Sequence, residues 1–545
     1  MLKADEINAL RDAATELTQP IIDYLLRDLA QRIVKAGQLT ATAQYEVWRL
    51  QQLGISQRET KKQLKKMLKV SNRELRKLLT QSAEAGYNYD IRSLPQVQAL
   101  PFGKNEAVQQ IVSAAVALAQ DDLSNITQTL GMVDPYGQAL PLQDAYRKCM
   151  DFAFMQVSTG AADYTTAIQQ ATKNLADKGV VWIDYESGAH TSLEAAVRRN
   201  VMSGMGLMQA EISQRTHDDL GADGWEIDAH SNSAPDHEPI QGRQYSDAAY
   251  TALNNSLVRR IGTLNCGHSA HPIIMGLTPQ QYSPAELEQM RQKNENGITY
   301  NGRHYTGYEA TQRQRNLETG MRRQKRKILI DEATGDAEKL QADQIKLQLM
   351  RQEYARFSSA AKLPTQGERA KAIGFGREQA NTAVKEYAKV AKAANSMYDM
   401  GSEEQNVRAY MRDLPIRKRI QSGEFPLNIH MGRQNKHIEG TKEYVQYVER
   451  MRRDGKYGPS RITISHDDAH ALVDTYKGIG ILQRDRHGRW RSSELITVHP
   501  DKIGVAVNDR TGAEGDTSVF CIHYSKDGVH ISPDYPSKKG AKCKR

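Results

Sequence analysis

Apolar residues recur at helical spacing through the first 130 residues, with charged residues between them. In "SQRETKKQLKKMLKVSNRELRKLL" (56–79) the apolar positions fall three and four residues apart, which predicts amphipathic helices. Ser56 with Glu59 and Ser71 with Glu74 have the spacing of a capping box, which predicts two helix starts. We therefore expect a helical region over 1–130. Its two tandem helices are either a packed hairpin, which the pattern favours, or a DNA-binding helix-turn-helix.

After residue 130 the pattern changes, and we expect a small α+β domain over 131–280. "GVVWIDYESG" alternates as a strand does and ends in a turn. "HTSLEAAVRRNVMSGMGLMQAEISQ" predicts a helix that opens on a capping box of Thr191 and Glu194. "DGWEIDAHSNSAPDHEPIQGRQYS" predicts a short strand and a long polar loop, and "IGTLNCGHSAHPII" predicts a second loop.

Residues 281–400 return to helical spacing. "SPAELEQM" has Ser283 as the expected cap, with proline in the first turn and glutamate at the third position. The charge-laced stretch from Met321 to Phe357 is typical of one long exposed or partly paired helix. Its basic run, Arg322 to Lys327, fits a solvated helix face better than a nucleic-acid contact. A linker is expected over 401–427.

From residue 428 onward, short β-like runs separated by turns predict a C-terminal domain over 428–545. The runs are "RITIS", "ELITVH", "IGVAVN" and "TSVFCIHYS", and the turns include "KDG", "DRHGR" and "NDRTGAEG". One helix, "DDAHALVDTYKG", lies between the first two runs. The chain is thus expected to be multidomain: mostly α in its N-terminal and middle regions, with a small α+β domain, and ending in an α+β domain on an antiparallel sheet.

Length and charge support this division. A chain of 545 residues is too long for one compact core. The net charge of +9 is unevenly spread, since Lys and Arg outnumber Asp and Glu by 21 to 15 between His430 and Arg545. That part also holds 8 of the 15 histidines, which indicates a separate basic module suited to an anionic partner.

The cysteines and the N-terminus bear on where the chain is made. Four widely spaced cysteines (Cys149, Cys266, Cys521 and Cys543) do not suggest a disulfide framework and favour synthesis in a reducing cytosol. The N-terminus has no apolar signal region, and no window approaches about 18 uncharged apolar residues, so no membrane span is expected.

Histidines and a cysteine gather in the two polar loops of the small α+β domain. They are His230, His237, Cys266, His268 and His271. Imidazole and thiolate groups suit zinc, and Cys266 with His268 can supply two ligands from one tight turn. The spacing matches no common finger pattern. Two interpretations stay open: a zinc site that includes Cys266, His268 and His237, or loops held by hydrogen bonds around a small buried cysteine.

These loops resemble a known family. "HSNSAPDHEPIQGRQYS" and "IGTLNCGHSAHPIIMGL", with "GVVWIDYESGAHTSLEAAVRRNVMSG", resemble the phage minor capsid protein 2 family over about residues 10–360. The resemblance implies a head-associated virion protein acting in head assembly or DNA packaging, with phage portal and major capsid proteins as partners. It also implies that the family's polar signature comprises His237, Gln241, Gly242, Arg243 and the run from Asn265 to His268.

The C-terminal module carries the residues of a metal-free ribonuclease. "NKHIEGTKEYVQY" supplies His437, and "CIHYSKDGVHISPDYP" supplies His523 and His530. Two histidines from distant segments can act as general base toward a ribose 2′-hydroxyl and as general acid toward the departing 5′-oxygen. Donors near the phosphoryl oxygens must also stabilise the developing charge. The candidate donors are Thr441, Ser460, Arg461 and Lys526.

A metal-dependent nuclease is less consistent with the sequence, because no carboxylate cluster accompanies these residues. Asp467 and Asp468 are the nearest pair, and we expect them in the first turn of a helix, where its dipole favours them. No cofactor is therefore expected for this module.

This module also resembles a known family. "HIEGTKEY", "GPSRITIS", "GVAVNDRTG" and "HYSKDGVHISP" resemble bacterial toxin 50, a ribonuclease toxin domain of polymorphic toxins, over about residues 430–540. The resemblance implies a barnase/EndoU/colicin/RelE-like fold and aligns His437, Thr441, Ser460 and His530 with the presumed active site. We expect His437 as base and His530 as acid, with His523 as an alternative structural neighbour. Arg461, Lys526, Ser525 and Tyr524 are the expected substrate-binding residues.

Two functional hypotheses follow. The first is a phage or prophage minor capsid protein with a C-terminal endoribonuclease toxin. It would be made in the bacterial cytoplasm, reside in the virion and cut RNA in a bacterial cytoplasm, with an immunity protein as a further partner. The second is a purely structural head-assembly protein whose C-terminal domain binds only nucleic acid or a virion partner.

Overall fold

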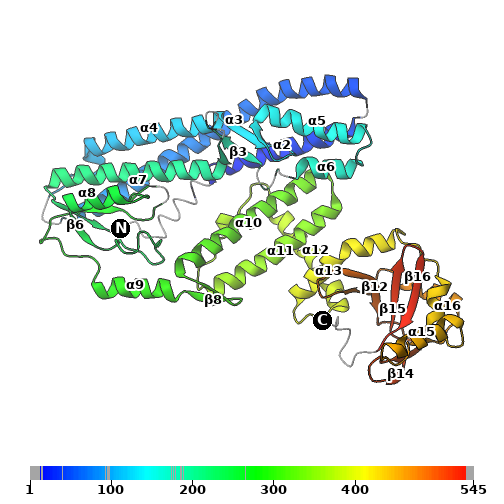
Figure 1. The fold of residues 1–545 in the computed structure, drawn as a ribbon. Helices are drawn as coiled ribbons and strands as arrows, with labels where there is room; N and C mark the ends of the chain where they lie inside the picture. The colour runs from blue at the N-terminus through cyan, green and yellow to red at the C-terminus, as the bar shows by residue number, and fades with distance from the viewer. Residues whose placement is uncertain are drawn as a thin grey trace. The chain divides into compact units, whose positions relative to one another are not determined.

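The computed structural model describes residues 13, 16–39, 41–92, 94, 98–173, 175, 177, 179–184, 187, 189–263 and 266–535, apart from the side chains of 53–58, 60 and 61. The chain forms two compact units, Met1–Ala383 and Val384–Arg545 (Figure 1). In the part of the chain that is described, no helix has the length and hydrophobicity of a membrane-spanning segment.

Unit 1 is mostly helical. Its described helices are α2 (Gln19–Gln38), α3 (Thr42–Arg92), η1 (Phe102–Lys104), α4 (Glu106–Gln128), α5 (Leu142–Ser158), α6 (Tyr164–Thr172), α7 (Leu193–Leu220), α8 (Asp247–Ser256), α9 (Pro284–Asn296), α10 (Gly307–Thr334), α11 (Ala337–Ala360), η2 (Gly367–Ala370) and the start of α12 (Arg377–Met397). Helices α3, α4 and α7 pack on one another (Figure 1). Their apolar faces join those of α2 and α5 in one core, where Ile21, Leu25 and Leu29 have no exposed surface.

Three small antiparallel sheets interrupt these helices. One has the order β2-β1-β3-β4, formed by β1 (Leu130–Val133), β2 (Ala139–Pro141), β3 (Val180–Ile183) and β4 (His190–Ser192). A second has the order β6-β5-β7, formed by β5 (Gly224–Ile227), β6 (Gln244–Ser246) and β7 (Ala270–Ile273). The third is a hairpin of β8 (Ile298–Tyr300) and β9 (Arg303–Tyr305). The predicted strands near Val180 and Trp225 are confirmed, whereas β6 and β7 were expected to be loop.

The expectation of two tandem helices over 56–79 is wrong, because α3 runs unbroken for 51 residues. No proline interrupts Thr42–Arg92, so nothing in the backbone ends the helix. Ser71 is buried inside it, and its hydroxyl donates to the carbonyl of Leu17 at 3.0 Å. The side chain of Ser56 lies outside the described residues. Both the hairpin and the helix-turn-helix interpretations of this segment therefore fail.

The start of α7 also differs from the prediction. The N-cap is Ser192, whose hydroxyl accepts from the amide of Ala195, and not Thr191. Glu194 instead turns to two arginines of α10: Arg322 donates to it at 3.0 Å, and Arg326 donates to it and, at 3.2 Å, to Asp23. Burial alone would raise the pKa of Glu194, but these guanidinium groups lower it to about 2.

The basic run Arg322 to Lys327 is therefore only partly solvated: Arg323 is exposed, but Arg322 and Arg326 are buried. Arg322 and Arg326 are 8% and 6% exposed and hold α10 to the start of α7. The long helix expected here is two helices, because α10 ends at Gly335 in the left-handed conformation and Asp336 caps α11. The two helices pack together around Leu317, Leu347 and Phe357 (Figure 1). Farther upstream, the predicted cap at Ser283 is confirmed, with a complete capping box.

Unit 2 combines helices with two antiparallel sheets. Its helices after α12 are α13 (Glu403–Gln421), α14 (Met431–Gln434), η3 (Asn435–His437), α15 (Lys442–Arg453) and α16 (His466–Tyr476). The sheet β10-β13-β14 is formed by β10 (Arg461–Ile462), β13 (Gly504–Val507) and β14 (Glu514–Thr517). The sheet β11-β12-β15-β16 is formed by β11 (Ile481–Arg484), β12 (Trp490–Ile496), β15 (Phe520–Ser525) and β16 (Gly528–Pro533). The expected C-terminal antiparallel sheet and the helix before β11 are thus present.

The second sheet buries one face. Phe520, Ile522 and Tyr524 alternate along β15 with Cys521, His523 and Ser525, so the two sets point to opposite faces. The first set packs with Leu472 and Val473 of α16 in the core of the unit. Asp467 and Asp468 lie in the first turn of α16 as expected, and Asp468 completes a capping box with Ser465.

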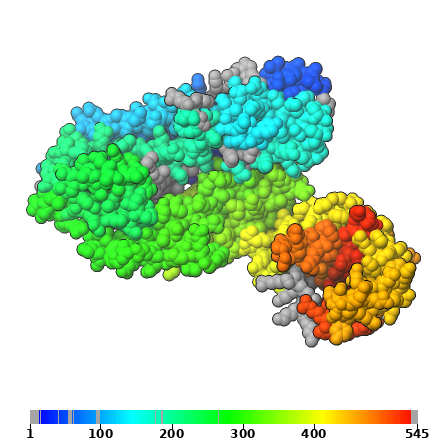
Figure 2. All heavy atoms as spheres, viewed as in Figure 1, coloured from blue at the N-terminus to red at the C-terminus, as the bar shows by residue number. Residues whose placement is uncertain are grey.

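The expected linker, residues 401–427, contains α13, and this helix belongs to the same core. Ile420 has no exposed surface and packs with Phe520 and Ile531. The guanidinium of Arg417 donates to the carbonyl of Gly478 at 3.0 Å and to the Tyr398 hydroxyl at 2.8 Å. In Figure 2 the atoms of the α13 region, in yellow, lie against those of the strands of unit 2, in orange and red.

Truncation of Ile420 tests whether α13 is part of the C-terminal fold. We expect Ile420→Ala to lower the unfolding free energy of unit 2 by about 2–5 kcal/mol, because it leaves a cavity in the shared core. Hydrogen exchange at β15 and β16 of the full chain measures the change. Ile479→Ala, at a side chain that is 44% exposed, is the matched control and should change protection little. Equal protection in the two variants would contradict this assignment.

Candidate functional site

Three histidines of unit 2 lie together. His530 stacks on His523 with ring centroids 4.6 Å apart and planes at 14°. The ring of His437 lies 5.9 Å from that of His530, with planes at 16°. In both pairs the ring planes are thus nearly parallel, and each of the three rings is half-buried. We refer to these residues as the histidine array.

Strand register places two members of the array. His523 of β15 and His530 of β16 are directly paired across the hairpin, so their side chains leave the same face of the sheet. Their neighbours Tyr524, Val529 and Ile531 point to the opposite, core face. The turn between the strands has only two residues outside the ladder, which fixes the register.

A separate segment brings His437 to the same place. Residues 428–434 run along the free edge of β16: the amide of His430 donates to Val529 O at 2.7 Å, and the amide of Val529 donates to Asn428 O at 2.9 Å. At the next position along this edge, the side chain of Gln434 makes the hydrogen bonds to β16. Its Nε2 donates to Ile531 O at 3.0 Å, and its Oε1 accepts from the amide of Ile531 at 2.9 Å. Gln434 is fully buried, so these bonds fix η3 and His437 beside β16.

The hydrogen bonds of His437 define its tautomer. Its Nδ1 lies 2.9 Å from the carbonyl oxygen of Ser460. A carbonyl oxygen can only accept, so Nδ1 carries the proton and Nε2 of the neutral ring carries a lone pair. Burial lowers the pKa of His437, against an opposing effect of the Ser460 bond, and the charge of Lys436 lowers it further. His437 is therefore neutral at neutral pH, with a basic nitrogen at Nε2.

The other two rings are also neutral. Burial lowers the pKa of His523 to about 4, and the neighbouring His437 adds to this effect. The pKa of His530 is far below its ordinary value because the ring is buried beside His523 and His437. His523 Nε2 lies 2.9 Å from the Ser532 hydroxyl, whereas His530 Nδ1 has no hydrogen-bond partner among the described residues. Within the array, His530 Nδ1 is thus a buried nitrogen whose hydrogen-bonding capacity the described residues leave unused.

Two cations contribute a positive field around the array. Arg433 and Lys436 lie on the segment that carries His437, and both charges lower the pKa of His530. Arg433 is 3.7 Å from Asp527 in the β15–β16 turn. The local field therefore opposes protonation of the histidines and favours an anion.

The other predicted site residues lie near this region but have structural bonds. Thr441 caps α15: its hydroxyl accepts from the amide of Tyr444 and lies 2.6 Å from Asn435 O. The hydroxyl of Ser460 accepts from the amide of Val507, while its carbonyl holds His437. Arg461 pairs with Glu514.

The residues of the β15–β16 turn divide between two faces. Ser525 donates to Gly528 O within the turn, and Lys526 is exposed. Tyr524 lies on the core face, and its hydroxyl bonds Glu494, so the structure separates it from the histidine array. Sequence reasoning missed Gln434 and Lys436; only the proximity of Lys436 to His437 in the chain gave a signal.

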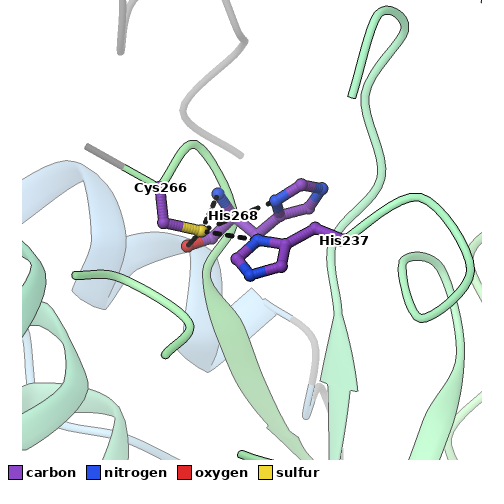
Figure 3. Close-up of side chains that lie close together, drawn as sticks. All are labelled: His237, Cys266 and His268. Atoms are coloured by element: carbon purple, nitrogen blue, oxygen red, sulfur yellow. Dashed lines mark hydrogen bonds between the residues drawn. The ribbon is translucent and has the colours of Figure 1, made fainter. Parts of the chain in front are cut away.

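A second group of polar side chains lies in unit 1. His237, Cys266 and His268 point toward one another from two loops (Figure 3), and their ligand atoms lie within 4.8 Å of one another. Cys266 Sγ is 3.1 Å from His237 Nδ1 and 3.6 Å from His268 Nδ1. All three residues are buried, and the group has the composition and compactness to hold a metal ion.

The other polar residues of the two loops differ in how they relate to this group. His230 stacks on His268 at 4.4 Å, whereas His271 is bonded to Asp90 of α3 at 2.6 Å and lies outside the group. Gln241 accepts from His268. Gly242 has φ +68°, and a Cβ there would lie 2.4 Å from Leu287, so only glycine fits without strain. Asn265 lies outside the described residues.

Comparison with protein families agrees with this division of the chain. Residues 2–357 match the family model of phage minor capsid protein 2, and residues 429–533 match that of bacterial toxin 50. Comparisons with curated proteins and with solved structures gave no significant match. The first match spans more than half of the chain. The chain therefore belongs to the phage minor capsid protein 2 family and carries a C-terminal region that matches bacterial toxin 50.

Proposed function

We propose that this protein is a virion component whose C-terminal unit is a metal-independent endoribonuclease toxin. The observation that carries the proposal is the histidine array, in which two segments about ninety residues apart meet on one face of a sheet. The match of the same region to a bacterial toxin family supports it. The basic balance of this region favours a polyanionic substrate.

The proposed reaction starts at His437. Nε2 of the neutral ring accepts the proton of a ribose 2′-hydroxyl, and the 2′-oxygen attacks the adjacent phosphorus. The bond from phosphorus to the 5′-oxygen then breaks. His530 donates a proton to this oxygen, leaving a 2′,3′-cyclic phosphate on one product and a 5′-hydroxyl on the other.

The acid role of His530 depends on the substrate. In the free protein the pKa of this ring is depressed, so it carries no proton to donate at neutral pH. A bound phosphodiester places a negative charge beside the ring, which raises its pKa and supplies the protonated form. Binding of the correct anion would thus complete the catalytic pair.

Stabilisation of the charge on the phosphoryl oxygens needs nearby donors. Lys436 and Arg433 act electrostatically on the array and are the first candidates. Lys526 and Ser525 in the β15–β16 turn, and Arg461, complete the proposed binding residues. Thr441 and Ser460 then act indirectly, since their bonds hold the segment and the ring of His437.

The architecture of unit 2 is compatible with a barnase/EndoU/colicin/RelE-like fold. It has antiparallel sheets, and α16 packs on the core face of the sheet that carries the array. The opposite face carries His523 and His530, which leaves the chemistry on the side away from that helix.

The proposed biological setting follows from the two families. The minor capsid region would join the phage portal and major capsid proteins, and the particle would carry the nuclease toward a bacterial cytoplasm. An immunity protein that covers the array would protect the cell in which the chain is made.

A second candidate function is structural. Neutral, closely stacked histidines with depressed pKa values also fit a packed surface that binds a virion partner or nucleic acid without cleaving it. Under that alternative the C-terminal domain has no hydrolytic role, and the histidines contribute only packing.

Replacement of His437 separates the two functions. We expect His437→Ala to reduce RNA cleavage by the purified full chain about 100-fold or more, because a positioned general base contributes about 10²–10⁴ in rate. The assay contains EDTA, and mapping of product ends should find 2′,3′-cyclic phosphates. His470→Ala, on the exposed face of α16, is the matched control. Intact RNA with the native chain, or equal cleavage by both variants, would leave only the structural alternative.

The pH dependence of cleavage tests the state of His437. Its pKa is lowered from 6.5, so the basic form persists below that pH, and the acid limb of kcat/KM should fall below pH 6.5. Because the charge of Lys436 contributes to the lowering, Lys436→Gln should move this limb upward. Steady-state rates measured within roughly two pH units of the ordinary histidine pKa define the acid limb in both proteins. An acid limb above 6.5 in the native chain would exclude His437 as the base.

A further inference from the structure

The Cys266 group in unit 1 joins two loops of one small sheet. Loop A (228–243) connects β5 to β6 and carries His237, and loop B (257–269) connects α8 to β7 and carries Cys266 and His268. The side chains meet between the loops, with exposures of 1%, 8% and 3% (Figure 3). Neither functional hypothesis for the C-terminal unit involves this group.

The spacing of the three ligand atoms fits a tetrahedral zinc ion. Zinc holds sulfur at about 2.3 Å and nitrogen at about 2.0–2.1 Å, which separates two tetrahedral ligand atoms by about 3.6 Å. Cys266 Sγ lies 3.1 Å and 3.6 Å from the two Nδ1 atoms, so small side-chain movements would complete the geometry.

Hydrogen bonds from the opposite loop orient both rings for this role. His237 Nε2 lies 2.7 Å from the carbonyl oxygen of Arg259, which can only accept, so Nε2 carries the proton and the Nδ1 lone pair faces Cys266. His268 Nε2 lies 3.0 Å from Gln241 Oε1. The amide of His230 donates to that same oxygen, which establishes it as an acceptor and gives His268 the same tautomer. Such outer bonds to oxygen acceptors are typical of metal-bound histidines.

The backbone also presents a hydrogen-bond donor to the sulfur. The backbone amide of His268 points at Cys266 Sγ with N···S 3.4 Å. A backbone donor stabilises negative charge on sulfur, which a metal ion requires of its cysteine ligand. Hard cations such as magnesium and calcium prefer oxygen ligands, whereas a thiolate with two imidazoles suits zinc.

A nucleophilic role for Cys266 fits less well. A cysteine beside a histidine can form a catalytic pair, but both members here are buried. Two imidazole lone pairs also converge on the one sulfur, which a catalytic pair does not need and a metal centre does.

We propose that His237 Nδ1, Cys266 Sγ and His268 Nδ1 bind a structural zinc ion that fixes loop A to loop B. The fourth position is left to water or to His230, whose ring stacks on His268. Loop B also packs closely on α7, since a Cβ at Gly206 of that helix would lie only 1.5 Å from Gly262 O.

Metal analysis of the full chain, prepared without a histidine tag and dialysed against Zn²⁺ and then buffer, tests the proposal. We expect about one zinc per chain, falling to roughly a tenth or less in Cys266→Ser and in His268→Gln, as removal of a ligand from a structural site predicts. The histidine array is the competing site, so His530→Ala is the essential control and should keep its zinc. His304→Gln, at an exposed histidine, controls for non-specific loss.

Cobalt provides a measurement that can be made on the native chain itself. Co²⁺ bound to the native chain should give a thiolate-to-cobalt charge-transfer band that Cys266→Ser lacks. Removal of the ion with a chelator should increase hydrogen exchange in 230–242 and 257–268 while leaving β15 and β16 unchanged. No charge-transfer band in the native chain, or zinc that is lost in His530→Ala and retained in Cys266→Ser, would overturn the proposal.

Discussion

The candidate site of unit 2 depends on one buried side chain, Gln434. Its amide takes the place of a strand residue: it donates to and accepts from the backbone of Ile531, on the free edge of β16. Because Gln434 is fully buried, loss of either bond would leave an unpaired polar group in the core. These bonds hold His437 beside the face of the sheet that carries His523 and His530, which are paired across β15 and β16. Without them, only the two histidines of the hairpin would lie on this face.

Each unit holds distant segments of the chain together at its candidate site, but by different interactions. In unit 2 a long-range amide pair and helix α13 hold distant segments around one face of a sheet. In unit 1 two polar loops are held by reciprocal hydrogen bonds, from His237 to Arg259 and from His268 to Gln241, around the cysteine. In both places a carbonyl-type acceptor selects the tautomer and so decides which nitrogen faces the partner. At each candidate site, the hydrogen bond made by one ring nitrogen thus determines whether the other ring nitrogen carries a lone pair.

The sequence predicted what is encoded locally and missed what is encoded by packing. The cap at Ser283 follows from residues three apart, and the helix over 467–478 and the strand around Ile522 follow from their periods. Ser71 has the same local pattern as a cap, but the bond of its hydroxyl to Leu17 places it inside a continuous helix. The charged run at Arg322 could not be distinguished from a solvated face, because Glu194 lies 128 residues away. Histidine chemistry, together with the resemblance to bacterial toxin 50, suggested that His437 and His530 meet. Gln434, which holds His437 in place, has no recognisable signal in the sequence. The catalytic roles of His437 and His530 remain predictions.

The central claim is that His437 and His530 act together on one phosphodiester, and a double-mutant cycle on RNA cleavage tests it most directly. Residues that act as a unit give grossly non-additive losses. The account predicts that His437→Ala, His530→Ala and the double variant all lose cleavage to a similar extent, about 100-fold or more, as expected for a disrupted acid–base pair. A double variant whose loss is the product of the two single losses, or single variants that cleave RNA as the native chain does, would contradict it.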